Sequence, residues 1–363
     1  MKRSVVFLLL IAAAVFVACG TVGAPPAAAP TEFQHFTVSN TAEWDDVRAI
    51  IAAGDHGMGY IIEITADFAV PGTTSPTFGT ARNTHITLLG EGRTISLSSN
   101  GSILQTALEQ VIIMDGLTLQ GRAGNNAAVV TLMGGAQHSG IGSTLEMRGN
   151  SVITGNDNTN PAAGGGIFTG RYCTVIMRDN ATITNNTTVH NGGGIRANQN
   201  THVIMRDNAT VSYNFGRTGG GILINTAGYL TMLDNSRIVG NTGSGSGGGG
   251  VWGSGRSIVT MRDNATIAGN ISEFPARTAG NGPGGGGIFV NGNFRFAGGT
   301  IYGTDGGANS NAVTGAPAAA IFISENGLAD YGRFDGDTWV RVGRITASSD
   351  TTVRVVNGVL QGL

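Results

Sequence analysis

Four aspartates recur at nearly equal intervals in this chain and could form a chemically active row. Asp179, Asp207, Asp234 and Asp263 follow one another at steps of 28, 27 and 29 residues. Carboxylates stacked on successive turns could hold calcium or supply the acid and base of glycoside hydrolysis. We expect instead an Arg/Asp ladder at a turn. In the calcium-binding nonapeptide repeat the Asp lies inside the glycine run, whereas the glycine runs here end in Ile or Val.

Other groups that could act in catalysis are scattered along the chain. The only adjacent acidic pair is Asp45-Asp46, which we expect on a helix away from the repeats, and glycoside hydrolysis needs two carboxylates on opposite sides of a sugar. His190 is expected beside a corner and His202 in a turn before a strand, neither with an obvious partner. The sequence has neither a Gly-His-Gly nor an Arg-x-Lys motif. We therefore predict no catalytic, cofactor-binding or metal-binding residue.

Cys173 is a second kind of candidate, because a lone thiol can be a nucleophile. The chain has two cysteines, and the other, Cys19, belongs to a segment with a different role. Cys173 stands at the start of an apparent strand, where the equivalent residues of other repeats are Thr201 and Ser257. We expect Cys173 to be a small filler residue.

These residues lie within an internal repeat, which is the dominant feature of the sequence. A Met-to-Asn tetrad occurs at 147–150, 177–180, 205–208, 232–235 and 261–264, at steps of 30, 28, 27 and 29 residues. A β-branched residue and a second asparagine follow each tetrad: Ile153 and Asn156, Ile183 and Asn186, Val211 and Asn214, Ile238 and Asn241, Ile267 and Asn270. A glycine cluster then ends in Ile167, Ile195, Ile222, Val251 or Ile288. Such periodicity is typical of a stacked solenoid.

Each repeat alternates apolar and polar residues with the period of a strand. In one unit, Val175, Met177 and Ile183 share one face, and no helical periodicity intervenes. Three strands of three to five residues per unit would be stable only when stacked on copies of themselves. We predict an all-β, right-handed parallel β-helix of about nine or ten coils, with asparagine ladders at the corners and glycines where a Cβ would clash.

Residues 35–84 depart from the repeat and are expected to cap the stack. Residues 36–38 are predicted as a strand. Trp44, Val47, Ile50 and Ile51 then recur at helical spacing after Asn40 and Thr41, and Gly54 stops the helix. A second strand is expected over 60–70. This short amphipathic helix would cover the open edge of the first coil.

The coils are expected over residues 85–303, and terminal coils and a C-terminal cap over 304–363. Phe296 takes the methionine position in a degenerate last copy of the repeat. Residues 320–323 and 353–356 are predicted as closing strands.

The first twenty residues are typical of a bacterial export signal. Lys2 and Arg3 precede an apolar run over 5–17, and Ala18, Cys19 and Gly20 resemble the cleavage box of bacterial lipoproteins. We expect 1–19 to be the signal peptide, Cys19 to carry the lipid, and 20–34, rich in Ala and Pro, to be a tether. Removal of Lys2 and Arg3 leaves 19 arginines and 23 acidic residues, a net charge of −4, so nucleic-acid binding is not expected.

The glycine clusters closed by Ile and the Ile-x-x-Asn segments resemble the paired motifs of chlamydial polymorphic outer-membrane proteins, which carry them in β-helical passenger regions. More closely, residues 36–363 resemble β-helix repeat lipoproteins of spirochaetes, which share the Trp-containing cap helix and the segments at 97–102 and 355–360. This resemblance implies a fold and an envelope location without an activity. An autotransporter also needs a C-terminal barrel of many strands, so we expect the lipid route.

We expect a non-catalytic, surface-exposed lipoprotein of the outer membrane or cell surface, adhesin-like and binding a glycan, matrix or surface protein, with no cofactor. A polysaccharide lyase or glycoside hydrolase acting on an extracellular glycan is the alternative, and a structural envelope protein the second alternative. Variable loops at 157–163, 187–191, 215–218, 242–247 and 271–284 would supply specificity. Glu273, Phe274, Pro275 and Arg277 in the longest loop are the candidate contact residues.

Overall fold

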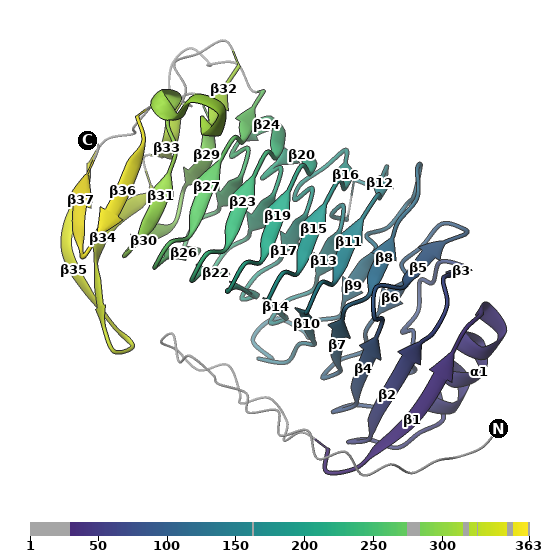
Figure 1. Cartoon of the computed structure of the whole chain (residues 1–363). Coiled ribbons are helices and arrows are strands. Elements are labelled where there is room, and N and C mark those ends of the chain that lie inside the picture. Colours follow the sequence, from purple (N-terminus) through teal and green to yellow (C-terminus); the bar gives the residue numbers. More distant parts are fainter. Residues whose placement is uncertain are drawn as a thin grey trace.

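The chain folds into a parallel β-solenoid of about nine turns (Figure 1). The computed structural model describes residues 30–161, 163–273, 284–314, 319–324, 326–346 and 351–361. Four sheets run along the solenoid, which we name A, B, C and D in the order in which one coil contributes to them. The predicted all-β parallel solenoid is confirmed.

Sheets A and B are the longest and meet at the corner that carries the aspartates. Sheet A contains, in spatial order, β1 (Phe33–Val38), β2 (Gly59–Ile64), β4 (His85–Leu89), β7 (Val111–Asp115), β10 (Thr144–Arg148), β14 (Thr174–Met177), β18 (His202–Met205), β22 (Tyr229–Met232), β26 (Ile258–Met261), β30 (Asn293–Phe296), β34 (Leu328–Asp335) and β35 (Thr338–Ile345). Sheet B contains β3 (Phe68–Val70), β5 (Thr94–Leu97), β8 (Thr118–Gln120), β11 (Val152–Thr154), β15 (Thr182–Thr184), β19 (Thr210–Ser212), β23 (Arg237–Val239), β27 (Thr266–Ala268), β31 (Gly299–Ile301), β36 (Val353–Val356) and β37 (Val359–Gln361).

Sheets C and D complete each coil. Sheet C contains β12 (Asp157–Asn158), β16 (Thr187–Thr188), β20 (Phe215–Thr218), β24 (Thr242–Gly247), β28 (Ile271–Ser272) and β32 (Ala312–Val313). Sheet D contains β6 (Leu104–Gln105), β9 (Val130–Leu132), β13 (Ile167–Thr169), β17 (Ile195–Ala197), β21 (Ile222–Ile224), β25 (Val251–Gly253), β29 (Gly285–Val290) and β33 (Ala319–Ile323).

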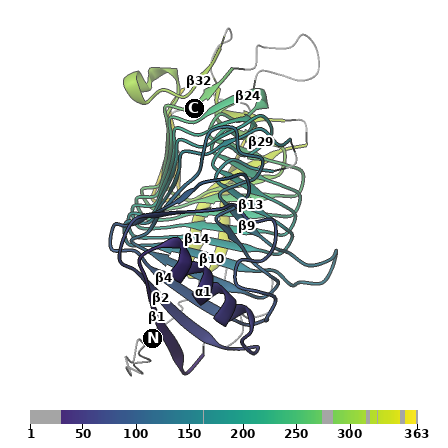
Figure 2. The same cartoon turned by 90° about the vertical axis from the view of Figure 1, so that its right-hand side faces the viewer.

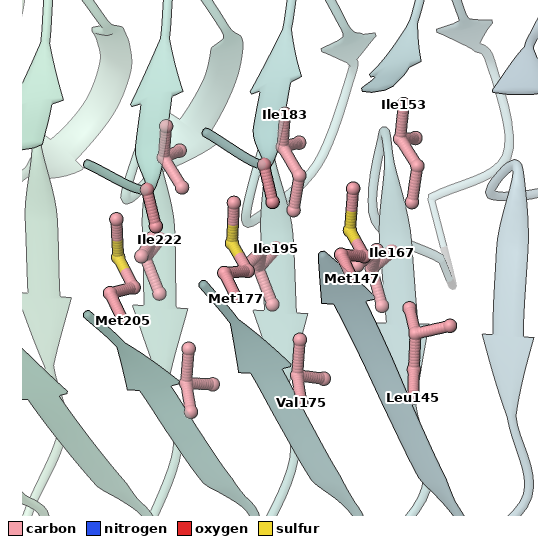
Figure 3. Packing of buried hydrophobic residues seen from close by; sticks show 14 of the residues in the cluster. Leu145, Met147, Ile153, Ile167, Val175, Met177, Ile183, Ile195, Met205 and Ile222 are labelled. Carbon is pink, nitrogen blue, oxygen red and sulfur yellow. The ribbon is translucent and has the colours of Figure 1, made fainter. Parts of the chain in front are cut away.

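The repeats stack in register, and their apolar residues fill the interior. The five tetrad methionines pair across successive coils, as Met177 does with Met205. The β-branched residues of sheet B pair likewise, as Ile183 does with Val211. These side chains are fully buried, and Figure 3 shows several of them, with Ile167, Ile195 and Ile222 of sheet D, pointing into one interior. Full burial of each contributes about 1.5–3 kcal/mol, so the stack is the core.

Sheet C corrects the expectation of three strands per coil with variable loops. Five of its strands, β12, β16, β20, β24 and β28, lie within the segments predicted as those loops. The segments are short and rich in Thr and Gly, so they carry little apolar alternation to reveal a strand. Pairing of the main chains with neighbouring coils is sufficient for a parallel ladder.

The glycine clusters form the corner between sheets C and D. A Cβ on Gly194 would lie 2.7 Å from the carbonyl oxygen of Gly221, one coil away. Gly192 has φ +69°, a conformation that residues with a side chain rarely adopt. The predicted role of these glycines is confirmed.

The N-terminal end is covered by α1 (Thr41–Ala52), which lies across the first coil (Figures 1 and 2). Asn40 caps the helix by accepting a hydrogen bond from the Glu43 backbone N–H, as in a capping box. Trp44 is buried, and its ring packs edge-on against Phe78 at a centroid distance of 5.5 Å. Among the described residues, no helix is long and apolar enough to cross a membrane.

The strand expected over 60–70 is two strands in different sheets. β2 ends at Ile64 and β3 begins at Phe68, so the chain turns from sheet A to sheet B at residues 65–67. Both strands contribute apolar residues, such as Ile64 and Val70, to the same core. Apolar content alone therefore does not reveal the bend between the two strands.

The C-terminal end is closed by antiparallel pairs. β34 and β35 form a hairpin, while β36 pairs antiparallel with both β31 and β37. A short 3-10 helix, η1 (Thr304–Asn309), precedes β32. The predicted strands at 320–323 and 353–356 are confirmed within β33 and β36, and Phe296 pairs with Met261 as expected.

Candidate functional site

The aspartate row is part of the scaffold. Asp179, Asp207, Asp234 and Asp263 all have positive φ, between 53° and 55°, a region that Asp tolerates. The carboxylate of each accepts a hydrogen bond of 2.8–3.1 Å from a backbone N–H of the preceding coil. The aspartates form a ladder at a turn, but the predicted Arg/Asp pairing is wrong, because the donor to each carboxylate is a backbone N–H. Arg178 lies 3.7 Å from Asp179 and forms its shorter contact, 2.7 Å, with Glu146.

Two asparagine ladders occupy the positions predicted for them. The inner ladder is buried and runs through Asn186, Asn214, Asn241, Asn270 and Asn311, whose side-chain amides bond to one another at 2.9–3.1 Å. In the outer, exposed ladder, the amide of Asn208 donates to Asn180 at 3.1 Å. These side chains satisfy their own polar groups, so they serve the fold.

Cys173 is fully buried and behaves as the expected filler. Its backbone carbonyl accepts a hydrogen bond from the N–H of His202, next to the equivalent residue Thr201. Burial raises the pKa of the Cys173 thiol to about 11. A thiol with so high a pKa is a poor nucleophile near neutral pH.

One of the two histidines differs from its predicted surroundings. His202 is the first residue of β18 instead of lying in a turn, and its ring stacks on Tyr229 at 4.4 Å. His190 lies in the turn between β16 and β17, as expected. Its buried Nδ1 has no hydrogen-bond partner among the described residues.

Carboxylates elsewhere are also engaged. Asp45 forms a salt bridge of 3.0 Å with Arg48 on α1. An open depression of about 430 Å³ at the C-terminal end includes Asp305, whose carboxylate accepts bonds from the Thr352 N–H and hydroxyl at 2.7 and 2.6 Å. Within the described ranges, no three His, Cys, Asp or Glu side chains are grouped so that they could hold a metal ion.

A row of large side chains on the outer face of sheet D is the most unusual surface feature. Each strand of this sheet points one central residue outward, and register aligns these residues along the solenoid. We call the row the ridge: Phe168, Arg196, Leu223, Trp252, Phe289 and Phe322. At about 4.8 Å per coil the ridge is about 24 Å long.

The rings of the ridge stack on one another. Trp252 and Phe289 have a centroid distance of 5.9 Å and an angle of 11°, and Phe289 and Phe322 have 5.2 Å and 18°. The Arg196 guanidinium lies 5.4 Å from the centre of the Phe168 ring, within the range of a cation–π contact. Leu223 is buried, whereas these other side chains stay half-exposed.

Sequence reasoning did not identify the ridge. All its members but Phe322 directly follow the aliphatic residues that close the glycine clusters, as Trp252 follows Val251. The signal was available, because a residue beside an inward one in a strand points outward. Of the predicted contact residues, Glu273 is exposed just after β28, and Phe274, Pro275 and Arg277 lie outside the described residues.

Comparison of the chain with protein-family models, with curated proteins and with solved structures found no match.

Proposed function

We propose that this chain is a non-catalytic, surface-exposed lipoprotein with an adhesin-like role, and that the ridge on sheet D is its contact surface for an extracellular glycan. The observation that carries the proposal is the row of half-exposed aromatic and arginine side chains. Such side chains dominate binding energies when they are aligned on one surface. A matrix or surface protein is the competing partner.

The fold itself does not require the rings. In the preceding coils the same outward row holds Gln105 and Thr131, so polar side chains are compatible with the position. Aromatic rings that are only half-buried forgo part of the burial that would make them stabilising. Their concentration from Trp252 to Phe322 therefore supports a binding role.

The proposed lipid anchor sets the orientation. Cys19 lies outside the described residues, and β1 begins at Phe33 at the end of the stack capped by α1. A tether over 20–34 would hold this end toward the membrane, with the hairpin of β34 and β35 pointing away. The likeness to spirochaete β-helix lipoproteins and to chlamydial polymorphic outer-membrane proteins supports an outer-membrane or cell-surface location. The ridge would then lie along the side of the projecting body.

The alternative of a polysaccharide lyase or glycoside hydrolase is less well supported. Those reactions need carboxylates free to act on a sugar, whereas the aspartate row accepts backbone hydrogen bonds. A purely structural envelope role would leave the ridge without a purpose. The three functions predict different behaviour of the purified chain toward a glycan. The proposal predicts binding without turnover, the enzyme alternative predicts turnover, and the structural role predicts no binding.

An array of glycans and matrix proteins, probed with the purified full chain in detergent, tests the proposal. We expect glycan binding that the double variant Trp252→Ala/Phe289→Ala reduces at least tenfold. Tyr229→Ala, which removes an outward ring from sheet A, is the matched control and should bind normally. Retention of binding by the double variant would exclude the ridge as the site.

A lyase assay on the same samples separates binding from turnover. Uronate-containing glycans are incubated with the chain, and the absorbance of unsaturated uronate products is followed. We expect no increase, and steady product formation would overturn the non-catalytic role.

A further inference from the structure

Charge is distributed unevenly around the solenoid. The described strands of sheet D contain no Asp or Glu, although acidic residues outnumber basic ones over the expected mature chain. The aspartate row lies at the corner of sheets A and B, on the other side of the coil. The described strands that carry the ridge are therefore free of the negative charge that marks the corner of sheets A and B.

Three basic side chains gather at one end of this face. Arg196 belongs to the ridge, His190 lies in the turn just before β17, and Arg217 is an exposed residue of β20 whose backbone N–H donates to the His190 carbonyl. Burial, together with the charges of Arg196 and Arg217, lowers the pKa of the His190 imidazole. Arg217 forms no ion pair with any described residue. We call His190, Arg196 and Arg217 the basic cluster.

The ridge itself also favours negatively charged or oxygen-rich groups. Because Trp252, Phe289 and Phe322 stack face to face, they expose their edges, and the edge of an aromatic ring is its positive part. The buried Nε1–H of Trp252 has no acceptor among the described residues. Stacked rings offer few free faces on which a neutral sugar could lie. The surface thus presents the positive edges of the rings together with the guanidinium groups of Arg196 and Arg217.

We infer that the ridge and the basic cluster bind a linear anionic polysaccharide, whose carboxylate or sulfate groups contact Arg196 and Arg217 while its chain follows Trp252, Phe289 and Phe322. A straight row with one side chain per coil matches a straight polymer with a regular repeat. Arginine donates paired hydrogen bonds to planar or tetrahedral anions. This inference rests on the proposed function and specifies the class of glycan.

The test compares polymers of similar length with the purified full chain. Polygalacturonate carries carboxylates, heparin carries sulfates as well, dextran is neutral, and polyglutamate is an acidic polypeptide. We expect binding to one or both acidic polysaccharides, with dextran and polyglutamate at least tenfold weaker. Raising the salt concentration should weaken the binding, because salt screens exposed charges.

Variants locate the contact. Arg217→Gln should weaken binding of the acidic polysaccharide about tenfold, as expected for loss of one charge-assisted hydrogen bond, and Arg196→Gln should weaken it at least as much. Arg237→Gln removes the same charge from sheet B and is the matched control. Since Arg217 is exposed, its variant should fold normally, which its thermal unfolding would verify. Equal losses for Arg217→Gln and Arg237→Gln would overturn the assigned site.

The outcomes also separate this inference from the proposed function. Binding to dextran or another neutral glycan through Trp252, with no preference for acidic polymers, would overturn the inference and leave the proposed function intact. Binding to polyglutamate as strong as to the acidic polysaccharides would show that negative charge alone determines binding. It would overturn the choice of a polysaccharide as the ligand. Failure to bind any glycan would overturn both the inference and the proposed function.

Discussion

The carboxylate of Asp207 accepts a hydrogen bond of 3.0 Å from the backbone N–H of Asp179, one coil earlier. Asp207 in turn donates its own N–H to Asp234 at the same distance. Asp207 thus links three coils by its main chain and side chain together. A row that resembles a metal or catalytic site in the sequence is therefore a continuous structural ladder.

Asp207→Ala should destabilise the fold by about 2–3 kcal/mol. The change removes a charge-assisted hydrogen bond and places a residue with a Cβ but no local hydrogen bond at φ 55°. Asp207→Asn keeps an acceptor oxygen, though not the charge, and tolerates the same backbone conformation, so it is expected to lose less than about 1 kcal/mol. Urea denaturation followed by circular dichroism measures the difference. A lowered midpoint in EDTA, restored by calcium, would contradict the scaffold role.

The two asparagine ladders should differ in what they contribute. Asn214 is buried and bonds to both neighbouring asparagines and to the Ile183 carbonyl, so Asn214→Ala leaves several buried polar groups unpaired and should cost about 3 kcal/mol or more. Asn208 is exposed, and Asn208→Ala should cost less than about 1 kcal/mol. Chemical denaturation measures the loss in free energy of unfolding for each variant. Equal losses would refute the distinction between the buried and the exposed ladder.

The buried thiol of Cys173 should make stability depend on pH in the alkaline range. Burial raises its pKa from 9.0 to about 11, so the native state favours the protonated form. The resulting stabilisation of the native state is complete below pH 9 and is lost as the pH rises through 11. It amounts to about 3 kcal/mol in total. Thermal unfolding at several pH values measures it.

Cys173→Ser is the control for this dependence. Other side chains also titrate above pH 9, so the difference between the two proteins isolates the thiol. Native Cys173 should also react with iodoacetamide far more slowly than the unfolded chain at pH 8. Equal alkylation rates would show that the thiol is accessible.

The cap helix should protect the end of the stack. Trp44 is 1% exposed and contacts Phe78, so Trp44→Ala should cost about 3–5 kcal/mol and expose a strand edge that favours association. Ile50→Ala changes an exposed residue of the same helix and should have little effect. Light scattering during mild heating distinguishes the variants. An unchanged monomer after Trp44→Ala would contradict the capping role.

The solenoid and the stacking of its repeats followed from sequence alone. Recurrence of a Met-to-Asn tetrad every 27 to 30 residues places Met177 beside Met205 and Asn186 beside Asn214, because a repeat that cannot bury its apolar face alone must stack on its copy. The cap helix was visible for a similar reason, since helical spacing and start and stop residues such as Asn40 and Gly54 are local properties. Local pattern and repetition were sufficient for these features.

Only the tertiary structure revealed sheet C, the bend at residues 65–67 and the ridge. Thr187 and Thr242 lie in strands because neighbouring coils pair with them, a property that their own residue types do not encode. Likewise, Arg196 and Trp252 belong to one surface only once the exact register of strands two coils apart is known. The direction in which a side chain points is set locally. Which side chains lie beside it on a face depends on how distant segments of the chain align.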